Sequence, residues 1–303
     1  MTDDTTLTLS RTLPAPRDLV WACWTDPQYV SQWFMPAPHK ALSAVIDLRP
    51  GGEFTVEMEV DGNVMKDPGV ILEVVPTRKL VFTDTYAPGW IPKPDPFMTA
   101  IIELSDQPEG TRYDVTIRHR SAEAAKQHAD MGFYDGWGKV AEQLGIAAKG
   151  LEGDEEGRAM LLTRHIDATP EQVWRAWTDP ELLPRWFGPD GFTCETKSID
   201  VKPGGSWRFD MLGHGRVFPN RHDYQVLDRP NRIVFHMNDD SEGAANKVVE
   251  VTLTPEGAGT RVQMRMIFAN PEDRLEALGF GALELGYTTL GKLAHVARIA
   301  PQG

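Results

Sequence analysis

The sequence predicts an α+β protein of two like domains in tandem, each a curved antiparallel sheet wrapped around a long C-terminal helix. Its length of 303 residues suits two domains. An internal repeat is the second observation: Leu9–Phe34 matches Leu162–Phe187 at an offset of 153, with 11 of 26 positions identical. The third is the order of patterns in each copy, which runs from a strand and two short helices through several strands to one long helix.

The repeat continues beyond this stretch and sets the domain boundaries. The same offset pairs the Pro-Gly-Gly turn at 50–52 with a second one, whereas Gly110-Thr-Arg pairs with Gly259-Thr-Arg at an offset of 149, so the first copy carries four extra residues. A period of this length is too long for a solenoid unit, so each copy is a whole domain. We expect a first copy at residues 1–150, an exposed acidic linker at 151–157 and a second copy at 158–303.

Each copy opens with a strand followed by a helix. Residues 6–13 alternate polar and apolar side chains, which is typical of a strand. In the second copy Thr169-Pro-Glu-Gln predicts a helix start, because threonine caps, proline takes the first turn and glutamine completes a capping box. The helix is expected to bury Trp24 in the first copy and Trp177 in the second, as core residues.

A second short helix, several strands and a long helix follow. Asp26 and Asp179 each precede a proline, so we expect them to cap the short helix rather than to catalyse. An apolar stripe predicts one long helix over residues 121–149, and Asn270-Pro starts its counterpart in the second copy. After the Pro-Gly-Gly turn, alternation predicts half-buried strands that begin with Phe54 and Trp207, and further strands of the first copy near 69–75, 79–86, 98–105 and 111–120.

The composition excludes several classes of protein. A formal net charge of −13 argues against nucleic acid or an anionic membrane surface as the partner. No apolar run approaches the ~20 residues of a membrane span, and the N-terminus lacks the regions of a signal peptide, so we expect a cytoplasmic protein without membrane insertion. Cys23 and Cys194 are expected to be free thiols. No histidines or cysteines stand at ligand spacing, so neither a metal nor another cofactor is expected.

These motifs resemble the START-like, or SRPBCC, superfamily with its helix-grip fold, and most closely the branch named after the C-terminal domain of the heat-shock protein 90 ATPase activator. The resemblance covers nearly the whole chain twice. It implies a hydrophobic cavity between sheet and long helix that binds lipids, polyketides or hormones in some members and catalyses cyclisation in others. It rests on Arg-x-φ-x-Ala-x-x-x-x-Val-Trp-x-x-Trp-Thr-Asp-Pro, the Trp-Phe that follows, the Pro-Gly-Gly turn, Pro-x-x-x-Leu-Val-Phe at 76–82 and Gly-Phe-Tyr-x-Gly-Trp at 132–137.

Two polar residues of the first copy fall on the inward phase of their strands. Asp84 follows Leu80 and Phe82, and His119 follows an inward-facing apolar series. The two side chains are weak catalytic candidates, because a carboxylate and an imidazole at one cavity could bind a polar ligand group or act as acid and base. The alternative is that both lie at strand ends and reach solvent. Their counterparts in the second copy are Met237 and Phe268.

The first copy is expected to be the more ligand-competent one, because a pocket needs mostly apolar walls and a few polar groups. The second copy fills the strand after its turn with Trp207 and Phe209, and we expect these side chains to close its cavity by packing. We expect a small hydrophobic molecule as the partner and a non-enzymatic role. The alternatives are a protein-interaction module similar to the chaperone activator, and a cyclase or hydrolase that uses Asp84 and His119. The expected ligand-binding residues are Phe54, Met58, Phe82, Asp84, Tyr86, Trp90, His119, Tyr134 and Trp137.

Two features allow two interpretations each. The loop from Tyr86 to Pro96 holds Trp90 near its tip, where the ring either covers the cavity mouth or only pins the loop. The long helices carry several glycines, which either let the helix pack closely on the sheet or leave room for a ligand. These glycines are Gly132, Gly136, Gly138 and Gly145, and in the second copy Gly279, Gly281, Gly286 and Gly291.

Overall fold

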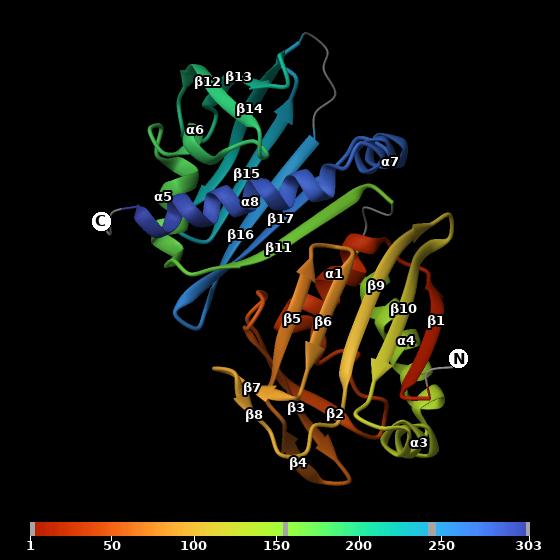
Figure 1. The fold of residues 1–303 in the computed structure, drawn as a ribbon. Helices are drawn as coiled ribbons and strands as arrows, with labels where there is room; N and C mark the ends of the chain where they lie inside the picture. Colours follow the sequence, from red (N-terminus) through yellow and green to blue (C-terminus); the bar gives the residue numbers. More distant parts are fainter. Residues whose placement is uncertain (1–3, 154–156, 242–246, 301–303) are drawn as a thin grey trace. The chain divides into compact units, whose positions relative to one another are not determined.

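The computed structural model describes residues 4–153, 157–241 and 247–300. The chain divides into two compact units after Gly153, and each unit has its own antiparallel sheet and its own long helix (Figure 1). The predicted fold class, α+β with two tandem helix-grip domains, is confirmed.

In the first copy, every strand of the large sheet pairs antiparallel with its neighbours, in the order β1-β10-β9-β6-β5-β3-β2, with β4 paired to β3. The strand expected at 79–86 ends earlier, because the chain leaves the sheet at Asp84 and forms a separate small hairpin. The strands are β1 Thr6–Leu13, β2 Lys40–Ile46, β3 Glu53–Val60, β4 Asn63–Lys66, β5 Gly69–Val75, β6 Lys79–Thr83, β7 Tyr86–Ala87, β8 Ile91–Pro92, β9 Thr99–Gln107 and β10 Gly110–Arg118.

In the second copy, the described residues form one antiparallel sheet in the order β11-β17-β16-β15-β14-β13-β12. The repeat found in the sequence is reproduced in the strand register: Ala41 pairs with Met58 in the first copy, and Cys194 pairs with Met211 at the same offset in the second. The strands are β11 Ala159–Ile166, β12 Phe192–Ile199, β13 Ser206–Gly213, β14 Arg216–Asp228, β15 Arg232–Asn238, β16 Lys247–Glu256 and β17 Gly259–Ile267.

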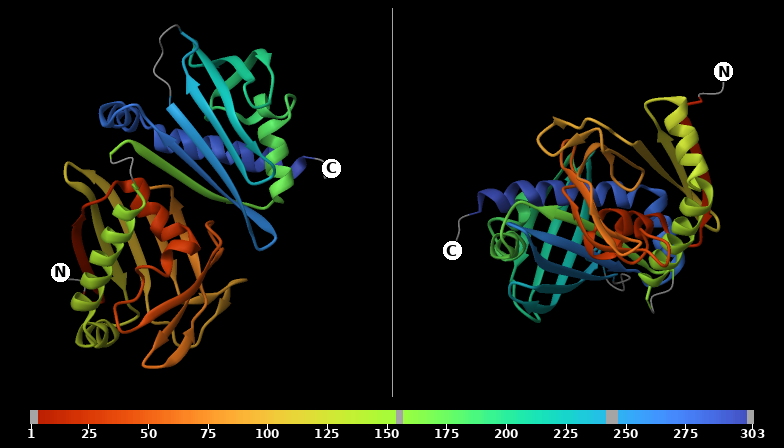
Figure 2. Two further views of the ribbon diagram at one scale, coloured as in Figure 1. Left: turned by 180° about the vertical axis from the view of Figure 1, so that it is seen from behind. Right: turned by 90° about the horizontal axis from the view of Figure 1, so that it is seen from below.

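The long helix of each copy lies across one face of its own sheet, as the two opposite views show (Figures 1 and 2). The single helix expected at 121–149 is wrong in one respect, because it is two helices. Gly132 takes a φ of 93° between them, a left-handed conformation that ends one helix before the next begins, and Gly281 does the same with 87°. The helices are α1 Arg17–Thr25, α2 Pro27–Val30, α3 Ala122–Asp130, α4 Phe133–Gly150, α5 Pro170–Thr178, α6 Leu183–Trp186, α7 Pro271–Gly279 and α8 Ala282–Ile299.

The predicted helix caps are formed, with one difference between the copies. Thr169 and the glutamine three residues on form the capping box of α5. Asp26 caps α2, where its Oδ1 accepts from the backbone N–H of Gln28 at 3.1 Å. Asp179 accepts from the N–H of Glu181 at 2.8 Å, but it holds a turn ahead of α6 rather than the helix itself. Both aspartates therefore have structural contacts.

In each copy the same indole contact ties the first helix to the end of the short helix or to the residues just after it. The Trp33 Nε1–H donates to the carbonyl of Cys23 at 3.0 Å, and the Trp186 Nε1–H donates to the carbonyl of Ala176 at 2.8 Å. Both indoles are fully buried. Burying an N–H group costs little free energy when the group has such a partner. The contact also fixes the position of the Trp-Phe pair that leads into the sheet.

Two helix glycines have neighbours that explain them. A Cβ on Gly145 would lie 3.2 Å from Pro14, and one on Gly286 would lie 2.5 Å from a methyl group of Leu162. At these positions the structure supports close packing of helix on strand. A Cβ on Gly136 would have no neighbouring atom within 4 Å, so packing does not explain this glycine.

The acidic linker expected at 151–157 lies partly outside the described residues, since 154–156 are not among them. Glu152 differs from the expectation of exposure. It is buried, and its carboxylate pairs with the ammonium group of Lys149 at 2.5 Å.

Candidate functional site

An aromatic cluster forms the interior of the first copy. The Trp24 ring from α1 lies 4.7 Å from the Trp33 ring, 5.9 Å from Phe82 and 6.4 Å from Tyr113, measured between centroids. Phe54 on β3 stacks on Phe82 on β6 at 4.2 Å, so two strands on either side of β5 contribute to the same wall. All five side chains are buried, and Trp24 is confirmed as a core residue.

Two polar atoms inside this cluster make no well-aligned hydrogen bond with any described residue, although they lie near each other. They are the Trp24 Nε1–H and the Tyr113 hydroxyl, both fully buried. Burial raises the pKa of Tyr113, and the Trp24 indole N–H is near enough to offset part of that rise. The Trp24 N–H can only donate a hydrogen bond, whereas the neutral Tyr113 hydroxyl can donate one or accept one. The pair therefore offers both kinds of group to the interior.

The second copy has an equivalent cluster with a different polar group. Trp177 lies at the position of Trp24, and its Nε1–H also has no partner in the described part of the chain. The second group is His222 on β14, which is 1% exposed. Its Nε2 also has no hydrogen-bond partner among the described residues. Four aromatic rings surround this imidazole, at centroid distances of 4.4 Å for Phe235, 4.8 Å for Phe187, 5.2 Å for Phe209 and 5.3 Å for Trp207.

The apolar surroundings keep His222 neutral. Burial lowers its pKa to about 3, because an imidazolium among aromatic rings loses its hydration without gaining a counter-charge. Strand register shows where the group comes from: His222 pairs with Trp207 on β13, and the corresponding pair in the first copy is Gly69 with Phe54. The first copy thus has no side chain where the second has an imidazole.

Asp84 has two hydrogen bonds of its own. Its carboxylate accepts from the backbone N–H groups of Phe97 and Met98 at 2.7 and 2.9 Å, which closes the loop that contains the β7–β8 hairpin. The side chain is half-buried at the end of β6. Among the described residues no hydrogen bond joins Asp84 to His119, so the two groups proposed as an acid–base pair are each held by other partners.

His119 is buried, as its strand phase predicts, and it forms a pair with a second histidine. Its Nε2 lies 2.9 Å from Nδ1 of His128 on α3, and its Nδ1 lies 3.1 Å from the carbonyl of Thr5. The Phe97 ring covers the pair, at 4.7 Å from His128. Burial and, secondly, the neighbouring His119 lower the pKa of His128 to about 4. This pair joins α3 to the end of β10.

The other expected wall residues lie toward the surface. Trp90 is 54% exposed; its ring contacts Tyr86 at 5.9 Å and covers Gly51 of the Pro-Gly-Gly turn. This placement supports a loop pinned by its own aromatic side chains. Tyr134 on α4 is 53% exposed, whereas Met58 and Trp137 are half-buried.

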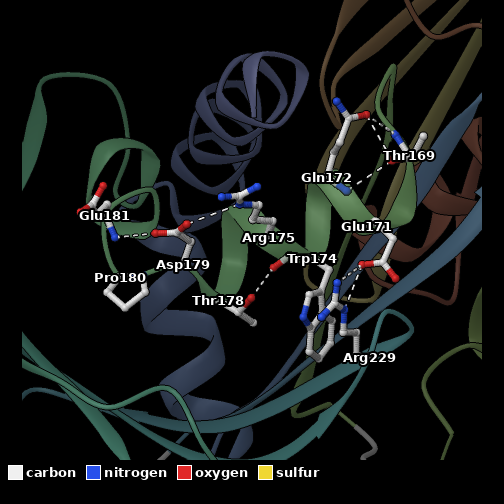
Figure 3. Close-up of a pocket in the computed structure, with 10 residues that line it drawn as sticks. All are labelled: Thr169, Glu171, Gln172, Trp174, Arg175, Thr178, Asp179, Pro180, Glu181 and Arg229. Carbon is white, nitrogen blue, oxygen red and sulfur yellow. Dashed lines mark hydrogen bonds and ion pairs between the residues drawn. The ribbon is translucent and has the colours of Figure 1, made fainter. Parts of the chain in front are cut away.

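We compare three of the pockets that are lined by described residues, and none of the three is lined by the nine residues expected from the sequence. The largest, about 890 Å³, runs along α5 in the second copy (Figure 3). Four of its charged groups form two ion pairs: Arg229 contacts Glu171 at 2.9 Å, and Arg175 contacts Asp179 at 3.5 Å. The other two measure about 390 Å³ in the first copy and 520 Å³ in the second.

Comparison with known proteins identifies the family. A family model described as "Activator of Hsp90 ATPase homolog 1-like protein" matches the chain twice, at residues 14–149 and 167–297. The chain belongs to this family. Family members share the START-like, or SRPBCC, helix-grip fold, which is a ligand-binding or polyketide cyclase-like fold. The comparison with curated proteins gives no match.

Solved structures of relatives each resemble either one copy or the whole chain. Protein NE0264 from Nitrosomonas europaea is 35% identical, over 50% of this chain and 99% of its own, with a TM-score of 0.48. Protein CV1439 from Chromobacterium violaceum is 25% identical, over 48% and 99%, with a TM-score of 0.39. The di-domain ARO/CYC BexL from the BE-7585A biosynthetic pathway is similar over 98% of this chain and 99% of its own, at 14% identity and a TM-score of 0.38.

Two kinds of feature are absent from the described residues. Within them no group of three or more His, Cys, Asp or Glu side chains is arranged to hold a metal ion. No helix formed by them is long and apolar enough to cross a bilayer.

Sequence reasoning missed the interior polar groups. It placed Trp24 correctly in the core, but periodicity does not show whether a buried polar atom finds a partner. His222 alternates with Tyr224 along β14, and both side chains are buried, but the mixed polarity of this strand gave no clear inward phase.

Proposed function

We propose that the protein binds, without catalysing a reaction, a small hydrophobic molecule that carries one hydrogen-bonding group. The ligand would lie in the interior of a helix-grip domain, against the aromatic cluster. One observation carries this proposal: buried polar atoms face aromatic walls without a partner among the described residues, namely the Trp24 Nε1–H with the Tyr113 hydroxyl, and the Trp177 Nε1–H with His222 Nε2.

The energetics favour a ligand group at these atoms. A buried donor or acceptor without a partner costs about 1–3 kcal/mol, and native proteins retain few of them. Ligand pockets combine mostly apolar walls with a few polar groups that orient the ligand. The rings of Phe54, Phe82 and Trp24 would supply such a wall, and flat aromatic molecules fit it best because ring–ring contacts add to area burial.

Binding is favoured over acid–base chemistry by the contacts of the two candidate groups. The Asp84 carboxylate closes a loop, and His119 is joined to His128. The first copy is favoured as the binding domain, because in the second copy Trp207 and Phe209 stack at 3.8 Å and fill the equivalent wall. The Tyr113 hydroxyl would then be the group that orients the ligand.

Titration calorimetry with 2-naphthol, an aromatic molecule with one hydroxyl, tests the proposal with Tyr113→Phe. Removing only the hydroxyl should weaken 2-naphthol binding about five- to tenfold, the value of one hydrogen bond. The same change should raise the free energy of unfolding of the unliganded protein by up to about 1 kcal/mol, because it removes an unsatisfied buried group. A purely structural hydroxyl would give the opposite change in stability.

Tyr134→Phe is the matched control, since it deletes the same atom from a side chain that is 53% exposed. Tyr134→Phe should change neither the affinity for 2-naphthol nor the free energy of unfolding. The proposal is wrong if 2-naphthol does not bind, or if Tyr113→Phe binds it as tightly as the unmodified protein does.

A further inference from the structure

One position of the long helix has the same structural role in both copies but a different charge. In the first copy, the Gln143 Nε2 group donates to the carbonyls of Trp33 and Met35, both at 2.9 Å. The repeat aligns Gln143 with Lys292, whose ammonium donates to the carbonyls of Gly188 at 2.9 Å and Phe192 at 3.1 Å. Each side chain ties the long helix to the segment after the short helix.

A second position changes in the same way. Gln32 on the surface of the first copy aligns with Arg185 in the second. Both members of each pair line a pocket: Gln32 and Gln143 line the one of about 390 Å³, and Arg185 and Lys292 line the one of about 520 Å³. Two neutral amides in the first copy are therefore replaced by two cations in the second.

The pocket of the second copy is positive in a chain whose net charge is −13. Asp190 is the acidic residue among its lining residues, so the two cations leave an excess of one positive charge. An ammonium has three donors, and the two carbonyls occupy two of those of Lys292. The Arg185 side chain is exposed and makes no ion pair with any described residue.

A thiol is a further polar group of this pocket. Cys194 lines the same pocket and donates to the carbonyl of Phe187 at 3.2 Å. Burial raises the pKa of this thiol to about 12, and Lys292 acts in the opposite direction. The thiol is therefore protonated at neutral pH, and it adds no negative charge to the pocket.

We infer that this pocket binds the carboxylate of a small organic acid with an apolar body. The planar guanidinium of Arg185 matches a carboxylate, and the remaining donor of Lys292 adds a second charge-assisted contact. Phe192 and Pro184 line the pocket beside these cations and would contact the apolar body. The site is separate from the proposed interior site, because it uses neither Tyr113 nor His222.

Calorimetric titration of the full chain with 2-naphthoate tests the inference, with Arg185→Gln and Lys292→Gln as variants. Each variant carries the residue found at the equivalent position of the first copy. Lys292→Gln should fold, because Gln143 makes the same kind of contact to two carbonyls. Each substitution should weaken 2-naphthoate binding about tenfold, and binding to the unmodified protein should weaken as salt is added.

Two comparisons separate this site from the interior site. Lys202→Gln removes a cation from the opposite end of β12 and should leave 2-naphthoate affinity unchanged. The affinity for uncharged 2-naphthol should be the same in all variants. Retention of 2-naphthoate affinity in Arg185→Gln, whose side chain is exposed and not needed for folding, overturns the inference, as does equal binding of inorganic phosphate, which lacks an apolar body.

Discussion

His222 makes the stability of the second copy depend on pH. Its pKa is about 3 in the folded protein and 6.5 as an unperturbed imidazole. Above pH 6.5 the group is neutral in both states, and its contribution is fully present. Below pH 6.5 the unfolded chain binds a proton that the folded chain excludes, so the free energy of unfolding falls as the pH falls, until about pH 3.

His222→Leu removes this dependence. Below pH 6.5 one such group costs up to about 1.4 kcal/mol per pH unit, which amounts to about 2 kcal/mol at pH 5. At pH 7.5 two effects oppose each other: the loss of an unsatisfied nitrogen favours the variant by about 1–3 kcal/mol, and the loss of ring contacts costs about 0.5–1.5 kcal/mol. We therefore expect a variant of similar or slightly higher stability at pH 7.5 that is clearly more stable than the unmodified protein at pH 5.

Urea unfolding of the full chain at several pH values measures this difference. Taking the variant minus the unmodified protein at each pH cancels the contributions of the carboxylates and of His128. The difference should grow steadily between pH 6.5 and pH 5. If the difference stays constant over this range, His222 takes up a proton in the folded protein. The conclusion that His222 has apolar surroundings without a counter-charge would then be wrong.

Two further substitutions test the packing of the domains. Trp177→Ala should destabilise the second copy by about 3–5 kcal/mol, because it removes a buried ring that lies 4.6 Å from the Trp186 ring. The same variant identifies which unfolding transition belongs to the second copy. An unchanged melt would contradict the assignment of Trp177 to the core. Gly286→Ala should cost about 1–3 kcal/mol, since its Cβ would lie 2.5 Å from Leu162, whereas Gly136→Ala, with nothing within 4 Å, should be neutral or stabilising by up to about 1 kcal/mol in thermal unfolding.

The architecture was predictable because the repeat appears twice in one chain. Both copies share the Trp-Thr-Asp-Pro run and the Pro-Gly-Gly turn, and a pattern with two independent occurrences constrains the fold more than one does. The break in the long helix was not predicted, although Gly132 is visible in the sequence. An isolated glycine is tolerated inside helices, so its left-handed conformation depends on the packing of α3, which periodicity does not reveal.

The candidate site was less predictable, for a physical reason. The strand phase placed His119 correctly in the interior, but it did not predict that His128 from α3 would face it. Asp84 lies just beyond the end of β6, where strand phase no longer applies, and its side chain accepts hydrogen bonds from the following loop. Alternation determines which face a side chain occupies, whereas its partner depends on elements distant in the sequence.

The two copies make the same side-chain contacts to the backbone, but they bury different polar groups. The indoles of Trp33 and Trp186 make the same contact, and Gln143 and Lys292 both tie the long helix to the chain after the short helix. The buried polar group is instead a phenol on β10 in the first copy and an imidazole on β14 in the second.

A neutral imidazole has one acceptor nitrogen and one donor nitrogen in fixed positions, whereas a phenol can rotate its proton to serve either role. Given the proposed function, this difference predicts that the copies do not share one ligand. Calorimetry with 2-naphthol should therefore give a stoichiometry near one per chain, which Tyr113→Phe weakens and His222→Leu leaves unchanged. Two equivalent sites, both weakened by either substitution, would refute this division between the copies.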